Sequence, residues 1–157
     1  MTGRPRRLAG ADCRRLLGES GVGRLVFTED ALPAVATLNY AVRGGALHFR
    51  TAAGTAVARC AGNAVVAFNV DSSVDPTLDP TVDPSVDPSV DPSVDPSVDP
   101  AGGDPPGGAA WSVTVTGRCR RADPGEDVRS ALQAWAPGPR EEFFRVDLAL
   151  LEGFSLG

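Results

Sequence analysis

A four-residue repeat, [VL]-D-P-[ST], occupies the middle of the chain and limits most strongly how it can fold. The repeat runs seven times between Val74 and Pro100, with Ala101 ending the last unit. A proline at every fourth position removes a backbone donor each time, so neither a helix nor a central strand can continue through it. Asp before Pro favours extended or turn conformers. We therefore predict one domain over residues 1–157, interrupted by a disordered loop at about residues 72–110.

The metal-ligating residues of the chain form no recognisable site. The repeat spaces its carboxylates regularly, which could gather oxygen ligands for calcium, but it lacks the alternating Asp and the turn glycine of calcium-binding loops. Cys13, Cys60 and Cys119 show no C-x-x-C spacing and no Cys/His cluster. We predict no metal site, and reduced thiols with structural roles.

The charge of the chain divides between the repeat region and the rest. The formal net charge is -5, and eight aspartates fall between Asp75 and Asp104, so the remainder carries -5 + 8 = +3. All 15 basic residues are arginines. They are scattered, without the basic stripe and interleaved aromatics of a nucleic-acid binder, and suit a small anionic ligand instead. The basic start has no apolar stretch behind it, and no run of about 18 apolar residues exists, so we expect a cytoplasmic protein with no membrane or nucleic-acid partner.

Outside the repeat, short runs of alternating apolar residues bounded by Gly, Pro and Asp predict strands. The predicted strands are Gly23–Thr28, Ala34–Tyr40, Ala46–Thr51, Ala64–Val70, Trp111–Arg121, and a C-terminal pair around Phe143–Val146 and Leu151–Leu156. Gly44-Gly45 indicates a hairpin turn. Helices are predicted at Gly10–Ser20, Thr55–Ala61 and Asp123–Trp135. This order predicts an α+β fold: an antiparallel barrel of about six or seven strands with a few short helices.

The stretch "LHFRTAAGTAVARC" contains a candidate anion site. Strand alternation puts Phe49 and Thr51 on one face and Arg50 on the other, at the end of a strand. The predicted helix begins soon after, at Gly54-Thr55. Backbone N–H groups at a helix start, an arginine fork and two threonine hydroxyls could together hold a phosphate. The alternative interpretation is an arginine that is merely solvated at the end of its strand.

Three motifs resemble one known family. They are Pro33, Asn39 and Tyr40 within one strand, F-R-T at Phe49–Thr51 followed by Gly54-Thr55, and W-S-V-x-V-x-G at Trp111–Gly117. Together they resemble the pyridoxamine 5'-phosphate oxidase-like family of flavin-binding split β-barrels. The resemblance covers nearly the whole chain outside the repeat.

This resemblance implies a homodimer that holds FMN at the subunit interface. The phosphate would lie near Arg50, Thr51 and Thr55, and the flavin ring near Asn39 and Tyr40. The residues implied to bind cofactor are Asn39, Tyr40, Phe49, Arg50, Thr51, Gly54, Thr55, Trp111 and Ser112. A planar ring needs an apolar slot with a few fixed polar partners, which suits this set. For Trp111 the alternative is plain core packing.

Two departures from the family pattern affect the expected function. Ala56 stands where family members commonly have a lysine, and the chain ends at Gly157 without the Arg/His segment that grips pyridoxal phosphate. We therefore expect an FMN-dependent oxidoreductase acting on an unidentified small molecule, and no synthesis of the vitamin B6 coenzyme. An F420-dependent reductase of the same fold, or a non-catalytic barrel that binds a small ligand, are the alternatives, and Ala56 favours the latter.

No catalytic side chain can be named from the sequence. It shows neither an acid/base pair nor a nucleophile with its base, so the chemistry would belong to the flavin. His48 is the only histidine. It could be imagined as a haem ligand, but a single histidine on a strand face is more often just half exposed.

Overall fold

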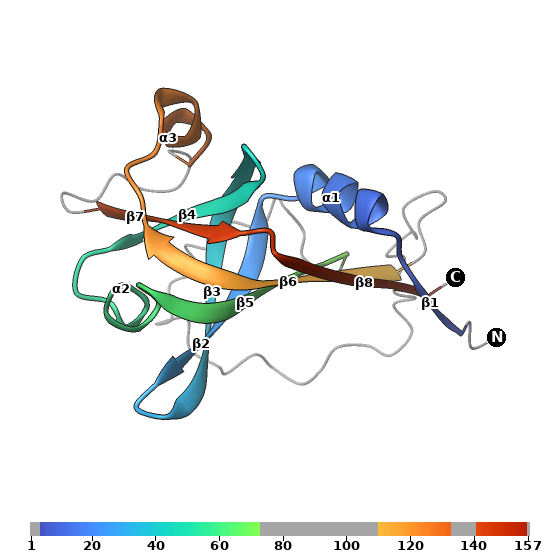
Figure 1. The fold of residues 1–157 in the computed structure, drawn as a ribbon, viewed down its shortest axis with the longest axis horizontal. Coiled ribbons are helices and arrows are strands. Elements are labelled where there is room, and N and C mark those ends of the chain that lie inside the picture. The colour runs from blue at the N-terminus through green and yellow to red at the C-terminus, as the bar shows by residue number, and fades with distance from the viewer. Residues whose placement is uncertain (1–3, 73–109, 133–140, 157) are drawn as a thin grey trace, which may run out of the picture.

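The strands close into a barrel. The structure, a computed structural model, describes residues 4–72, 110–132 and 141–156. Its strands form one antiparallel sheet in the order β1-β8-β6-β5-β2-β3-β4-β7, and a further pairing of β6 with β7 closes the ring from β6 round to β7. Figure 1 shows this ring with both chain ends on the same side, where β1 and β8 extend beyond it.

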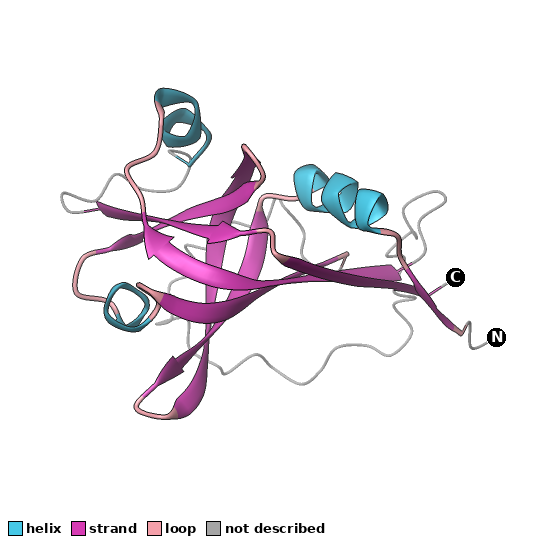
Figure 2. Ribbon diagram, in the orientation of Figure 1, coloured by secondary structure: helices cyan, strands magenta, loops and turns pink. Residues whose placement is uncertain are grey.

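The elements agree with the predicted α+β fold (Figure 2). The strands are β1 (Pro5–Arg7), β2 (Val22–Glu29), β3 (Leu32–Arg43), β4 (Ala46–Ala52), β5 (Ala64–Asp71), β6 (Ala110–Arg121), β7 (Glu141–Asp147) and β8 (Leu150–Leu156). The helices are α1 (Gly10–Glu19), α2 (Ala56–Cys60) and α3 (Glu126–Leu132). The split-barrel architecture is confirmed. None of the helices in the described ranges is long and apolar enough to cross a membrane.

Three elements differ from the sequence-based expectation. Helix α3 begins at Glu126 rather than Asp123, and the rest of its predicted length, to Trp135, lies outside the described residues. Strand β1 was not predicted, because its three residues, Pro-Arg-Arg, show no apolar alternation; it forms by pairing with β8, in register from Pro5↔Leu156. Strand β3 is longer than predicted and runs through the Gly44-Gly45 turn into β4, and both glycines have positive φ, 60° and 72°. Such angles suit glycine, so the predicted hairpin turn is confirmed.

The repeat itself lies outside the described residues, but the two strands that flank it are direct neighbours. Asp71 of β5 pairs with Ser112 of β6. Beyond that pair, Ser72 N donates to the Trp111 carbonyl at 3.0 Å, and Trp111 N donates to Ser72 Oγ at 3.1 Å. Residues 73–109 therefore connect two paired strands whose hydrogen bonds continue to the base of the loop.

The barrel interior is filled by stacked aromatic rings. Phe49, Phe68 and Phe144 are fully buried. The ring centroids of Phe49 and Phe144 lie 5.4 Å apart, and those of Phe49 and Phe68 lie 6.4 Å apart. Helices α1 and α2 add buried side chains to the same core, among them Leu17 and Val57. Helix α3 packs separately, on the outer face of β3, through a small cluster that includes Val128.

Strand β6 changes partner at Gly117. It pairs with β8 over Ala110–Thr116 and with β7 over Cys119–Arg121. A Cβ atom on Gly117 would lie only 2.2 Å from the backbone oxygen of Asp147, which no packed side chain tolerates. The close approach of β7 that closes the barrel therefore requires glycine at this position.

Replacing Gly117 by alanine should destabilise the fold. Because the new methyl group would press on backbone rather than on a flexible side chain, we expect a loss of about 1 to 3 kcal/mol in the free energy of unfolding, as for other overpacked sites. The matched control is Gly18→Ala in α1, where a Cβ meets nothing within 4 Å; it should be neutral or gain about 0.5 kcal/mol from helix propensity. Urea titrations of both variants make the comparison, and equal stabilities would contradict the role given to Gly117.

Deleting Val74–Pro100 should leave the fold intact. The hydrogen bonds between Ser72 and Trp111 close the loop at its base, and shortening it from 37 to 10 residues changes the closure entropy by only about 1.2 kcal/mol, in favour of folding. The melting temperature is the measurement. A fall of more than about 5 °C would mean that the repeat packs on the barrel.

Candidate functional site

Two of the predicted cofactor residues lie in the core. Tyr40 is 4% exposed, and its hydroxyl donates to the Leu17 carbonyl at 2.6 Å. Burial raises the pKa of Tyr40 to about 12, so the hydroxyl stays protonated and keeps this bond at physiological pH. Phe49 is fully buried between Phe68 and Phe144. In the folded chain both side chains tie the barrel together and face its interior.

The turn between β4 and α2 brings three predicted residues together. The hydroxyl oxygens of Thr51 and Thr55 lie 2.9 Å apart. Thr55 caps α2: its Oγ1 accepts from Ala58 N at 3.2 Å and donates to the Ala52 carbonyl at 3.0 Å. Gly54 has φ +82°, so the tight turn between strand and helix depends on glycine. The sequence placed this turn correctly.

Arg50 lies on the other face of β4. It is half-buried and sits opposite Phe143 in the register of β4 with β7. Thr51 follows it directly, and neighbouring side chains of a strand point to opposite faces. An anion held by both Arg50 and the threonine pair would therefore have to lie at the end of β4, where the two faces meet.

A network of polar side chains, here called the polar cluster, lies on the outer face of β2, β5 and β6. Arg24 Nη1 donates to Asp71 Oδ2 at 2.9 Å. Asn69 Nδ2 donates to Ser112 Oγ at 2.9 Å and to Thr114 Oγ1 at 3.0 Å. Of the residues in the polar cluster, only Ser112 is among the predicted cofactor-binding residues. The signal that could have found Asn69 and Asp71 is the alternation of polar with buried residues in "AFNVD".

Asn39 carries an unsatisfied acceptor. It belongs to β3, opposite Val22 of β2, on the face that does not bear Tyr40. Its Oδ1 atom is buried and has no hydrogen-bond partner among the described residues. A buried acceptor without a partner costs about 1 to 3 kcal/mol. A donor from a ligand or from a second chain would remove that cost, so Asn39 is a binding candidate on the structure as well as on the sequence.

Trp111 borders an apolar hollow at the end of the sheet. The hollow measures about 340 Å³, and its walls are Pro5, Ala110, Trp111, Ser112, Phe154 and Leu156. Trp111 is half-buried and packs against the main core, as the core-packing interpretation expects. Its role in a flavin pocket stays a prediction, because this hollow contains neither Asn39 nor Tyr40.

An apolar row crosses the outer face beside the polar cluster. Val35, Val26, Ala67, Thr116 and Leu150 are successive cross-strand neighbours from β3 to β8. The two ends of the row, Val35 and Leu150, are 63% and 53% exposed. Exposed apolar side chains that gather on one face can mark an interaction site.

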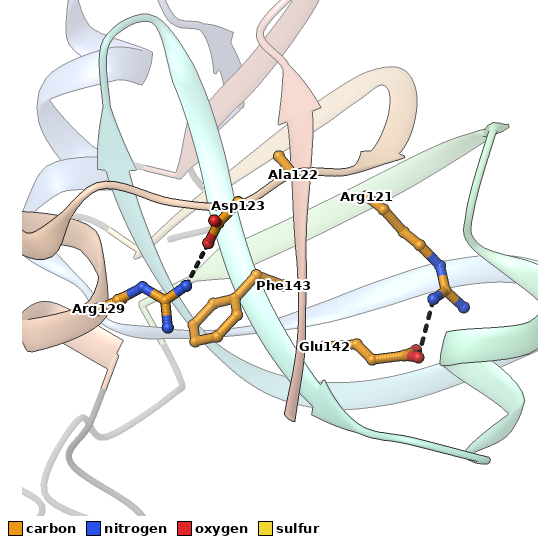
Figure 3. A pocket seen from close by; sticks show the side chains of 6 residues that line it. All are labelled: Arg121, Ala122, Asp123, Arg129, Glu142 and Phe143. Atoms are coloured by element: carbon orange, nitrogen blue, oxygen red, sulfur yellow. Dashed lines mark hydrogen bonds and ion pairs between the residues drawn. The ribbon is translucent and has the colours of Figure 1, made fainter. Parts of the chain in front are cut away.

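A further hollow, of about 360 Å³, opens where β6, β7 and α3 meet (Figure 3). Arg121 Nη1 donates to Glu142 Oε1 at 2.9 Å at one end of it. Arg129 pairs with Asp123 at the other end and lies over the Phe143 ring, 4.9 Å from its centroid. Each ion pair is neutral on balance, and none of the predicted cofactor residues lines this hollow.

The cysteines and the histidine take no part in a metal site within the described ranges, where no cluster of three or more ligating residues is found. All three cysteines are free, and burial raises the pKa of Cys119 to about 12, which leaves its thiol unreactive. His48 Nε2 lies 3.3 Å from the Arg43 carbonyl. Burial lowers the pKa of His48, which favours the neutral ring.

Comparison with solved structures gives the same fold over nearly the full length. The FAD binding protein from Mycobacterium smegmatis is 21% identical, with a TM-score of 0.61 over 97% of this chain and 98% of that chain. A FAD-binding protein from Mesorhizobium loti is 20% identical, with a TM-score of 0.66 over 98% and 99%. A conserved protein of unknown function from Corynebacterium diphtheriae is 20% identical, with a TM-score of 0.63 over 98% of each chain. No curated protein matches the sequence.

The family comparison covers the part of the chain that holds most of the candidate residues. Residues 10–79 match the family model described as pyridoxamine 5'-phosphate oxidase. This range includes α1, the strands β2 to β5 and the turn at Gly54-Thr55, while Trp111 and Ser112 lie beyond it. The resemblance of this chain to the pyridoxamine 5'-phosphate oxidase-like family is thereby confirmed.

Proposed function

We propose that the protein is an FMN-dependent oxidoreductase of the cytoplasm, acting on a small molecule. The observation that carries the proposal is the buried, unpartnered Oδ1 atom of Asn39 on the outer face of the barrel. Flavin rings present N–H groups that such an acceptor can bind. The match to the pyridoxamine 5'-phosphate oxidase family model and the fold shared with FAD-binding proteins support a flavin in general.

Residues on two parts of the barrel would hold the cofactor. Asn39 and Ser112 on the outer face would contact the ring, and Arg50 with the Thr51–Thr55 pair would hold the phosphate at the end of β4. Bound FMN would supply the hydride or electron transfer. The protein's part is to orient the ring on the sheet and to keep water from it.

A second copy of the chain would complete the site. Among the described residues the outer face carries exposed side chains such as Val35, and a planar ring needs a slot with two walls. The exposed Val35 and Leu150 on this face would add apolar contacts to a self-complementary dimer. We therefore propose a homodimer that packs through this face and encloses the flavin.

Two other functions could use the same site. The deazaflavin F420 carries a phosphate that the same residues could hold, and visible absorbance separates the two cofactors because FMN shows two maxima and F420 one. The other alternative is a non-catalytic barrel that binds a small ligand, and Ala56 favours it because the first residue of α2 then brings no positive charge to a cofactor phosphate. Mass spectrometry of the ligand that co-purifies decides between all three.

Arg50→Ala should weaken the binding of FMN but not the binding of riboflavin. A charge-assisted bond to phosphate is worth about 1.5 to 3 kcal/mol, or about tenfold to a hundredfold in affinity. Ala56→Lys should strengthen FMN about fivefold, because an exposed cation beside the phosphate adds about 1 kcal/mol. Fluorescence titrations with both ligands make the test. Equal weakening of FMN and riboflavin by Arg50→Ala would show that Arg50 is structural.

The dimer should show twice the chain mass of 16.2 kDa in light scattering. Val35→Asp places a charge on the apolar row, so the dimer of this variant should dissociate. Flavin binding should be lost as well, because the site needs both chains. Ala11→Asp makes the same charge change on the exposed side of α1 and serves as the control. A wild-type monomer that still binds flavin tightly would exclude the interface site.

A further inference from the structure

A hollow lined by arginines lies between α2 and the far end of β6, and the flavin proposal makes no use of it. Its volume is about 310 Å³, and its walls are Ala58, Arg59, Gly62, Asn63, Arg120 and Arg121. Half of these residues are therefore arginines. The volume falls at the lower end of the range of about 300 to 1,000 Å³ found for small-ligand sites.

Two of the arginines are held in place by weak surface contacts. Arg59 donates to the Gly54 carbonyl at 2.8 Å and pairs with Glu29 at 3.2 Å. Arg121 pairs with Glu142 at 2.9 Å. The arginine side chains are 59% and 60% exposed, and ion pairs at such exposure contribute about 0 to 1 kcal/mol. An incoming anion can therefore compete with these carboxylates.

Arg120 is the least neutralised of the three. It lies directly opposite Arg145 in the register of β6 with β7. Like charges in that position repel each other. Asp147 serves both: its Oδ2 accepts from Arg120 at 2.8 Å and its Oδ1 from Arg145 at 3.0 Å. One carboxylate thus faces two guanidinium groups.

The excess positive charge of the barrel is concentrated around this hollow. The charged groups at and beside it are Arg59, Arg118, Arg120, Arg121 and Arg145, against Glu29, Glu142 and Asp147, giving 5 - 3 = +2. The described residues as a whole hold 14 arginines and 12 carboxylates, which is also +2. The rest of the described surface is therefore neutral on balance.

We propose that this hollow binds a small, multiply charged oxyanion of the diphosphate type. Guanidinium forks match phosphate oxygens in pairs, and a hollow with three arginines among its lining residues offers charge for two linked phosphates rather than one. Gly62 contributes no side chain to the wall; a Cβ there would make ordinary contacts, 3.6 Å from Phe144 Cε1 and 4.0 Å from Arg121 Nε, and a larger side chain would extend further. The proposal does not depend on flavin binding, because Arg50, Thr51 and Thr55 are not among the residues that line this hollow.

Calorimetric titration of the full-length protein with inorganic pyrophosphate tests the proposal, with inorganic phosphate compared at the same ionic strength. Pyrophosphate should bind more tightly than phosphate. Arg120→Gln should weaken pyrophosphate about tenfold. Gly62→Val leaves the charge unchanged but fills the hollow, so it should weaken binding at least as much. The control is Arg7→Gln, which removes an arginine paired with Glu152 at 3.3 Å on β1 and β8.

Three results would overturn the proposal. The absence of pyrophosphate binding would reject the site. If Arg7→Gln lost as much affinity for pyrophosphate as Arg120→Gln, the binding would be general attraction by a basic surface and not binding at this hollow. Normal binding by a folded Gly62→Val variant would place the anion outside the hollow. Arg50→Ala separates this site from the flavin site, because it should weaken FMN and leave pyrophosphate binding unchanged.

Discussion

The barrel depends on the change of partner that β6 makes at Gly117. One edge of β6 pairs with β5 throughout, while the other pairs first with β8 and then with β7. The change needs the Asp147 backbone to approach more closely than any side chain would allow. The pairing of β6 with β5, in which Cys119 lies opposite Ala64, carries Arg120 and Arg121 to the region beside α2. The two edges of β6 thus do different work: one closes the barrel against β7, and the other places the arginines beside α2.

The fold was largely predictable because each strand alternates within its own sequence. The runs around Val26, Phe49, Phe68 and Val115 alternate buried with partly exposed residues, as a sheet with one core face requires. Strand β1 could not be predicted, since Pro-Arg-Arg contains no apolar residue to alternate and pairs only because β8 offers an edge. Local pattern therefore finds strands that bury side chains and misses those held by backbone bonds alone.

The site was less predictable than the fold, because its residues come together only through the way in which the strands pair. Arg50 and Thr51 are adjacent in the sequence but belong to opposite faces of β4. Arg24, Asn69 and Thr114 are far apart in the sequence, yet they are cross-strand neighbours on β2, β5 and β6. Motif spacing places residues that share one turn, such as the Thr51–Thr55 pair, and carries no information on which strands meet. The polar cluster needed the structure to be recognised.

The two candidate anion sites lie at opposite ends of one short helix, and the physics of the two ends differs. Helix α2 has five residues, with Thr55 before its first turn and Arg59 in its last. A helix start offers backbone N–H groups to an anion, whereas a helix end presents carbonyl oxygens that repel one. Hydroxyls and amides can therefore support a phosphate near Thr55 together with the single guanidinium of Arg50, but the hollow beyond Arg59 must rely on its guanidinium groups alone. Exposed charges are screened by salt more strongly than hydrogen bonds are, so affinity at the arginine hollow should be the more sensitive of the two to ionic strength.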